Sequence, residues 1–202
     1  ENGERVYTCA HCNETKTETL VFHAPYIGRY DCSEDGSKIT KIYWQIISDT
    51  LYVYENIDTP EWSAYKDDIA TAVFTKNATV IPVRACYKYP NLTTVNAAAA
   101  ETVGAYAFDE CQSLTSLKID AAKLEDYAFY GCTALESFDL GNHLTEVGRN
   151  VFKNCTALQS VTVQNGVEKI GYGMFEGCSA LEDIDLPDSV DEIGAHAFEN
   201  CS

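Results

Sequence analysis

Cysteines are the residues of this chain whose type and spacing most readily suggest chemistry, and three of the nine lie near the amino terminus. Cys9 and Cys12 form a Cys-x-x-Cys pair, and Cys32 follows further along the chain. A zinc site would combine these cysteines with His11 or His23, but the sequence lacks a clear second pair at ligand spacing. A thioredoxin-like redox pair requires a βαβ context that this sequence does not provide. We therefore expect no metal cofactor, and we favour a disulfide between Cys9 and Cys12 or between one of them and Cys32.

Five of the remaining cysteines recur at a fixed distance from a phenylalanine. Each follows its phenylalanine by three positions, and the phenylalanines are 21, 23, 23 and 23 residues apart. The pairs are Phe108 and Cys111, Phe129 and Cys132, Phe152 and Cys155, Phe175 and Cys178, and Phe198 and Cys201. A unit of this length cannot bury its own apolar face and has to stack on its neighbours, so the period predicts a solenoid. We expect Phe129, Phe152 and Phe175 to stack in a buried ladder.

The recurring cysteines are predicted to form a column inside this solenoid. A buried free cysteine behaves as a small hydrophobe, and its thiol is inert. A disulfide ladder is disfavoured, because side chains that point the same way into a core meet the required dihedral angle poorly. We therefore expect Cys111, Cys132, Cys155 and Cys178 to be reduced, buried and unreactive.

Each repeat also carries the alternation of a short strand. A leucine is followed by apolar residues three and five positions later, as in Leu158, Val161 and Val163. This is the period-two pattern of a strand with one buried face, and it predicts one short strand per turn. The unit also has a recurring glycine, which marks a corner that needs positive φ or a close backbone approach. It stands at Gly104, Gly148, Gly171 and Gly194.

One copy of the repeat is shorter than the others. Only nine residues separate Ile119 from Phe129, against eleven in the later copies. In this copy Glu125 and Asp126 replace the aliphatic residue and the glycine. Because stacking constrains the strand and core positions more than the connections, we interpret the difference as a shortened outer loop.

The sequence shows little sign of catalytic machinery. Its histidines share no recurring neighbourhood with a nucleophile, and it contains no G-x-S-x-G, glycine-rich phosphate loop or H-E-x-x-H. The sequence therefore indicates a protein that is not an enzyme.

The repeat resembles a known family. The segments EIGAHAFENC, KIGYGMFEGCSALEDIDLPDSV and EVGRNVFKNCTALQSVTV are similar to the BspA-type leucine-rich repeats of bacterial cell-surface proteins. The frame extends upstream to a degenerate first repeat, in which Cys86 takes the place of the phenylalanine and Tyr89 that of the cysteine. The resemblance implies an α/β fold with a right-handed leucine-rich repeat solenoid over residues 76–202. It also implies an extracellular or cell-surface location.

The exposed strand face, which is the concave surface of a leucine-rich repeat, is our candidate for ligand binding. One outward phase places Lys118, Asp139, Thr162 and Asp185 in a row across adjacent strands. Asp183 shares a face with Asp185, and these two carboxylates are suited to weak binding of a cation. The alternative is a face that is merely solvated.

Residues 30–75 are predicted to form an amino-terminal cap. β-Rich runs at 42–46 and 51–54, with a turn-like segment between them, indicate a hairpin. Pro60 and the helical spacing of apolar residues over 62–69 then indicate a helix. A hairpin followed by such a helix is similar to the cap of the BspA-like family.

Two tryptophans lie in this cap. Trp44 and Trp62 are candidates for stacking on sugar rings, since indole faces suit that role. Both fall on the apolar phase of their elements, so we predict that they belong to the core of the cap.

Residues 1–29 are polar and threonine-rich. They resemble the short Tyr-Thr-Cys-x-x-Cys-x-x-x-Lys-Thr segments that occur along surface proteins of gut bacteria. We interpret them as the end of an upstream module.

Charge restricts the class of partner. The chain has 14 lysines and arginines against 31 aspartates and glutamates, and residues 101–202 hold 18 acidic and 5 basic side chains. This balance argues against nucleic acid and against an anionic membrane surface, which both require basic groups. No apolar stretch is long enough for a transmembrane helix, so we expect no membrane insertion. The expected partner is an extracellular protein or a glycan.

The ends of the chain suggest a fragment. It lacks an initiator methionine and a signal peptide, and it stops one residue after Cys201. We expect an internal part of a longer precursor, with a solenoid truncated at its carboxyl terminus. The last half-repeat, from about Gly194, is expected to fray, leaving a monomer or a weak end-to-end association that the net charge of −17 opposes.

Two functions compete at this level. The first is a non-catalytic adhesion or binding module at the cell surface, which presents the repeat surface to a protein or glycan. The second is a structural spacer or scaffold attached to a catalytic or anchoring domain outside this sequence. A binding surface should be chemically distinctive from strand to strand, whereas the exposed positions of a spacer should be interchangeable.

Overall fold

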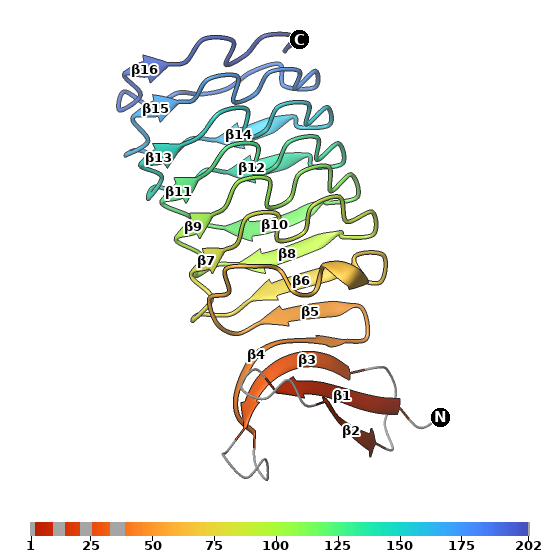
Figure 1. The fold of residues 1–202 in the computed structure, drawn as a ribbon. Coiled ribbons are helices and arrows are strands. Elements are labelled where there is room, and N and C mark those ends of the chain that lie inside the picture. The colour runs from red at the N-terminus through yellow and green to blue at the C-terminus, as the bar shows by residue number, and fades with distance from the viewer. Residues whose placement is uncertain (1–2, 10–14, 21–25, 33–38, 202) are drawn as a thin grey trace.

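The structure, a computed structural model, describes the backbone of residues 3–9, 15–20, 26–32 and 39–201 and the side chains of Arg29, Asp31 and residues 41–201. Figure 1 shows a stack of turns that rises from the amino-terminal strands to the carboxyl terminus. Between residues 80 and 170, strands of three or four residues alternate along the chain with strands of two residues. The predicted single strand per turn is thus wrong, because two sides of each turn pair with the neighbouring turns.

The longer strands form one face of the stack (Figure 1). An eight-stranded sheet has the order β10-β8-β6-β5-β4-β3-β1-β2, and the pair β12-β14 lies beyond it. From β5 to β10 the neighbours are parallel, as expected when a full turn of chain leads to each strand. The strands are β1 (Gly3–Cys9), β2 (Thr15–Leu20), β3 (Tyr26–Cys32), β4 (Ile39–Ile47), β5 (Thr50–Val53), β6 (Thr71–Phe74), β8 (Thr94–Ala97), β10 (Ser116–Ile119), β12 (Ser137–Asp139) and β14 (Ser160–Thr162).

The two-residue strands line a second side of the turns (Figure 1). They form a parallel four-stranded sheet of order β13-β11-β9-β7 and a parallel pair, β15-β16. The strands are β7 (Val80–Ile81), β9 (Thr102–Val103), β11 (Lys123–Leu124), β13 (Glu146–Val147), β15 (Lys169–Ile170) and β16 (Glu192–Ile193). The core lies between the two sides.

The fold is a β-solenoid of stacked parallel strands, so the predicted α/β class and the helical part of the cap are wrong. Among the described residues the only helical element is a 3-10 turn at Ser63–Tyr65. None of the helical structure in this part of the chain has the length and hydropathy that crossing a membrane would require.

Stacking on the first repeat explains why the cap segment is not an α-helix. The Trp62 Nε1 group donates to the carbonyl oxygen of Ala85 at 2.8 Å, and the Trp62 carbonyl oxygen accepts from the Tyr89 hydroxyl at 3.4 Å. The same carbonyl accepts from the Tyr65 N–H three residues later at 3.0 Å, as in a 3-10 turn, whereas an α-helix would use the N–H four residues later. Contacts with the next turn therefore override the helical spacing of the sequence.

Two other predictions for the cap are confirmed. Strands β4 and β5 pair as an antiparallel hairpin, with Ser48 in the left-handed region at φ 57°. Trp44 and Trp62 are buried, and their rings meet edge to face with centroids 5.9 Å apart. Both tryptophans therefore belong to the core of the cap.

The amino-terminal strands extend the sheet of the cap. β3 pairs antiparallel with β4 and parallel with β1. The assignment of residues 1–29 to an upstream module stays a prediction. His11, Cys12 and His23 lie outside the described residues, as do the side chains of Cys9 and Cys32, so the disulfide also stays a prediction.

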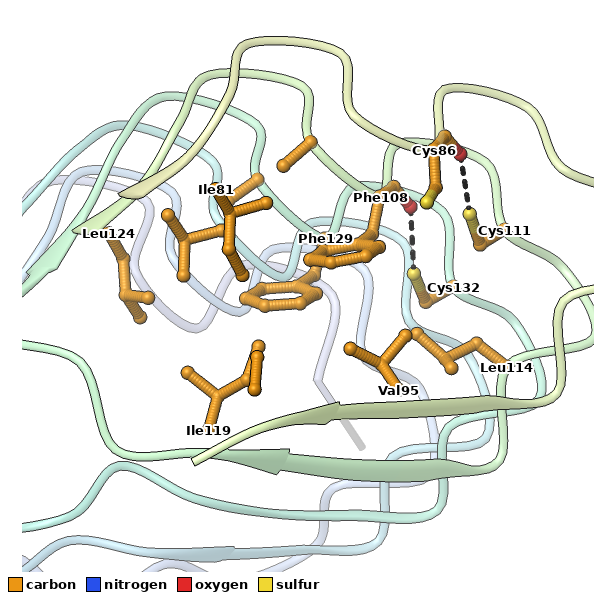
Figure 2. Close-up of a cluster of buried hydrophobic side chains, with 14 of the residues drawn as sticks. Ile81, Cys86, Val95, Phe108, Cys111, Leu114, Ile119, Leu124, Phe129 and Cys132 are labelled. Atoms are coloured by element: carbon orange, nitrogen blue, oxygen red, sulfur yellow. Dashed lines mark hydrogen bonds between the residues drawn. The ribbon is translucent and has the colours of Figure 1, made fainter. Parts of the chain in front are cut away.

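The predicted phenylalanine ladder is confirmed, and Figure 2 shows the rings of Phe108 and Phe129 one above the other. Phe129, Phe152 and Phe175 are fully buried, and their nearly parallel rings have centroid separations of 5.1 and 5.7 Å. Phe108 extends the ladder at 5.4 Å from Phe129, and Phe198 at 5.6 Å from Phe175. Each ring thus covers the ring of the turn below it.

The cysteine column lies beside this ladder, and its thiols donate hydrogen bonds to the preceding turn. Cys132 Sγ lies 3.2 Å from the Phe108 carbonyl oxygen, which Figure 2 marks, and Cys155 Sγ lies 3.2 Å from that of Phe129. The four predicted column cysteines are fully buried, and all are free. Burial raises the pKa of the Cys111 thiol to about 12, so the reactive thiolate is scarcely populated at neutral pH.

The recurring glycine is required by the close approach of the neighbouring backbone, and it does not have positive φ. A Cβ atom on Gly104 would lie 2.7 Å from the Val83 backbone nitrogen. In the short repeat Leu124 pairs with Val103 and Val147, so Leu124 is the aliphatic residue of the unit. Glu125 alone occupies the glycine position, which shifts our sequence alignment of this repeat by one residue.

Replacement of Phe152 by alanine should lower the free energy of unfolding by about 3–5 kcal/mol, because the ring is fully buried between two others. Urea unfolding measures the change, and Thr162→Ala on the exposed face is the control. A loss below about 1 kcal/mol would show that the ladder is not part of the core.

Thiol titration should find at least four free cysteines in denaturant without reductant, because the structure leaves the column unpaired. The native protein should react slowly with the same reagent, since the thiols are buried. A count below two in denaturant would instead support a disulfide ladder.

Candidate functional site

The exposed face of the longer strands carries two rows of polar side chains. One row is uniform and bears hydroxyl groups: Thr94, Ser116, Ser137 and Ser160. The other row varies: Asn96, Lys118, Asp139 and Thr162. Strand pairing places Lys118 beside Asn96 and Asp139 beside Thr162, and all four are exposed. Three of the predicted binding residues therefore lie on this face.

The other two predicted residues lie beyond the last long strand. Asp183 and Asp185 are exposed, but the chain from Leu181 to Leu186 forms no strand in the structure. Asp183 Oδ1 accepts a hydrogen bond from the Ile184 N–H at 2.9 Å. Local side-chain to backbone bonds of this kind compete with strand pairing. A binding role for the five residues stays a prediction.

A hollow of about 470 Å³ opens at the carboxyl ends of β10 and β12. It brings Lys118 and Asp139 together but does not include Thr162, Asp183 or Asp185. The lining residues are Leu117, Lys118, Ile119, Asp120, Asp139, Gly141, Asn142 and Gln164. We call this site the strand-end hollow.

The short repeat accounts for the position of the hollow. The connection from β10 to β11 spans only residues 120–122, whereas the next two connections span 140–145 and 163–168. A short connection beside two longer ones leaves a step in the stack. Residues on both sides of this step line the strand-end hollow, which therefore occurs where the shortest of these connections meets a longer one.

The acidic groups of the hollow are held by their own chain. Asp139 Oδ1 accepts from the Gly141 N–H at 2.9 Å and from Gln164 Nε2 at 3.5 Å. Asp120 Oδ2 lies 2.9 Å from His143 Nδ1. Gly141 has φ +64°, and a Cβ there would lie 2.1 Å from Asp120 Oδ1, so only glycine lets Asp120 lie here without displacement.

Unlike the two carboxylates of this hollow, which have hydrogen-bond partners, Lys118 has no charged partner among the described side chains. Its ammonium group makes no ion pair with any residue whose side chain the structure describes, although Asp120 and Asp139 line the same space. The exposed lysine is therefore available to a ligand. Sequence reasoning identified Lys118 and Asp139 but missed Asp120, Asn142, His143 and Gln164. These four lie on connections that have no fixed pattern, and the two-residue deletion was the only signal.

The family model of the BspA type leucine rich repeat region matches residues 79–202 in six copies. The chain belongs to the BspA-type leucine-rich repeat family. The match begins before Cys86 and Tyr89 and so includes the degenerate first repeat. No curated protein sequence matches the chain.

Solved structures of leucine-rich repeat proteins share the fold of this BspA-type chain. A leucine rich cell surface protein from Faecalibacterium prausnitzii is 24% identical over 85% of this chain and 50% of its own, with a TM-score of 0.67. A leucine-rich repeat protein from Bacteroides ovatus is 17% identical over 89% of this chain and 51% of its own, with a TM-score of 0.62. This chain spans about half the length of these two proteins.

A third similar structure is the T. pallidum leucine rich repeat protein. It is 20% identical over 86% of both chains, with a TM-score of 0.53. At such identities the likeness concerns the fold, and the side chains of the strand-end hollow have to be judged from this chain.

A second hollow, of about 420 Å³, lies on the side of the two-residue strands in this BspA-type protein, between Tyr106 and Gly148. Its charges are satisfied internally. Lys123 pairs with Glu125 at 3.5 Å and with Glu146 at 3.3 Å, and Glu125 Oε2 accepts from the Ala105 N–H at 3.1 Å. This hollow therefore offers less to a ligand than the strand-end hollow.

Asp109 is an unusual carboxyl group on the turn that carries Phe108. It is only 6% exposed, and its Oδ1 atom has no hydrogen-bond partner among the described residues. Burial, followed by the nearby Glu110, raises the pKa of Asp109 to about 6, although Lys88 and Arg84 oppose the shift. Ionisation of Asp109 therefore costs free energy in the folded protein.

The stability of the protein should fall as pH rises through this pKa. Between pH 4 and 6, roughly, the native state keeps the Asp109 proton that the unfolded state has lost, so its free-energy contribution decreases with pH and stays low above that range. Asp109→Asn should therefore raise the free energy of unfolding at pH 8 and change it little at pH 4. Urea unfolding from pH 4 to 8 tests this, with the exposed Asp67→Asn as control. A destabilised Asp109→Asn at pH 8 would contradict it.

Proposed function

We propose that this chain is a non-catalytic binding module of a bacterial surface protein, and that its strand face and strand-end hollow contact an extracellular protein or glycan. The observation that carries the proposal is the ammonium group of Lys118, which forms no ion pair with any described side chain and lies beside Asp139 in a polar hollow. The name of the structurally similar F. prausnitzii protein, a cell surface protein, supports the proposed location.

The two rows on the strand face favour binding over a purely structural role. A spacer is expected to have interchangeable exposed positions, and the hydroxyl row from Thr94 to Ser160 has that character. The other row changes from amide to cation to carboxylate to hydroxyl between Asn96 and Thr162. Such variation orients a polar partner and gives specificity. The uniform row keeps the spacer or scaffold as the second candidate.

The acidity of the chain supports the class of partner. A net charge of −17 disfavours binding to nucleic acid or to an anionic membrane, since both attract basic groups. A protein or glycan partner has no such requirement.

Combined replacement of Asp139 and Asp185 by alanine should weaken binding about tenfold, or about 1.4 kcal/mol, because one exposed acceptor in the strand-end hollow and one beyond the last long strand are removed. Partners are first sought on arrays of glycans and extracellular-matrix proteins, and affinity is then measured by surface plasmon resonance. The control carries Asp67→Ala and Asp68→Ala, which remove two exposed carboxylates from the cap. Equal affinity of the wild type and the Asp139 and Asp185 variant would move the site to the loops or the cap.

A further inference from the structure

We propose that the strand-end hollow binds a neutral, polyhydroxylated ligand, namely a hexose unit of a glycan. This inference rests on the proposed binding function and narrows it to one ligand class at one site. It follows from the hydrogen-bonding groups, the charges and the size of the hollow.

The hollow offers both donors and acceptors. Lys118 contributes an ammonium group, and the amides of Asn142 and Gln164 both donate and accept. Asp120 and Asp139 contribute carboxylate oxygens, which only accept. A sugar hydroxyl both donates and accepts, so neighbouring hydroxyl groups suit a lining in which these functions alternate.

The charges disfavour ionised sugars. An acidic sugar would place its carboxylate near Asp120 and Asp139, on a chain whose net charge is already −17. An amino sugar would bring its ammonium group close to that of Lys118, and this repulsion offsets part of the attraction of Asp120 and Asp139. Like charges in one site cost affinity and exclude wrong partners. A neutral sugar avoids both repulsions and can hydrogen-bond to the ammonium and amide groups and to the carboxylate oxygens.

The size and the rigidity of the hollow also suit a sugar. Its volume of about 470 Å³ falls in the usual range for small-molecule sites, roughly 300–1,000 Å³. The Asp139 carboxylate is fixed by Gly141 and Gln164, and the Asp120 carboxylate by His143. Groups that are already oriented lose less conformational entropy when a ligand binds.

The test uses a glycan array that presents matched neutral, sialylated and amino-sugar versions of the same cores. Neutral glycans should bind best, and titration calorimetry then measures the affinity of a neutral hit. Lys118→Gln and Gln164→Ala should each weaken this binding about tenfold. Lys76→Gln, which alters an exposed lysine just after the cap, should leave it unchanged. Urea unfolding confirms that the variants remain folded.

Three results would overturn the inference. They are a preference for sialylated or amino-sugar glycans, neutral binding that Lys118→Gln and Gln164→Ala both leave intact, and an array on which no glycan binds. A protein partner whose affinity depends on Asp139 and Asp185, found when no glycan binds, would uphold the proposed function and reject this ligand class. Loss of both kinds of binding would reject the two proposals together.

Discussion

The carbonyl group of each ladder phenylalanine is the point on which the stacking of this solenoid depends. The Phe129 carbonyl oxygen accepts from the Cys132 N–H at 3.3 Å in its own turn and from the Cys155 thiol at 3.2 Å in the next turn. One buried oxygen thus closes a tight turn and joins two repeats. Without the thiol, half of its hydrogen-bonding capacity would be lost inside an apolar core, which is costly. Cysteine suits the position because it is small and apolar enough to be buried and still carries a weak donor.

The same segment determines where the chain has to adopt strained backbone. Residues two positions before and after each ladder phenylalanine have positive φ, as at Tyr127 (59°) and Gly131 (65°). In these left-handed segments the amide groups point along the stack. The Phe129 N–H, for example, donates to the Val151 carbonyl oxygen of the next turn at 2.9 Å. Bulky residues accept this conformation, which ordinarily favours glycine or asparagine. At Tyr106 and Tyr127 the rings stack on each other at 5.0 Å on the surface, so the regularity of the core extends to the exterior.

The sequence was sufficient to predict the repeated core positions of the solenoid, but not the structure of the cap or the reason for the recurring glycine. The period of phenylalanine and cysteine predicted the ladder, the thiol column and the family, because stacked positions are bound to a fixed spacing. The helix expected from Trp62 to Ile69 is absent, since a spacing compatible with a helix is also compatible with a turn that inserts two apolar residues into a solenoid core. The glycine position permitted two explanations, and only the contact between Gly104 and the preceding turn decided between them.

The candidate site lies where this regularity breaks, and that follows from the physics of the stack. Identical turns generate identical surface groups, so a discrete hollow needs an irregular connection. The short connection at residues 120–122 is irregular in this way. It leaves the core undisturbed, because Leu124 still pairs with Val103 and Val147. Asp120 then approaches Gly141 on the next connection, a contact that requires the missing Cβ and the positive φ of that glycine. A solenoid of this kind can therefore change its binding surface by altering the length of one connection, while the carbonyl, thiol and ring contacts of the ladder keep every other turn in register.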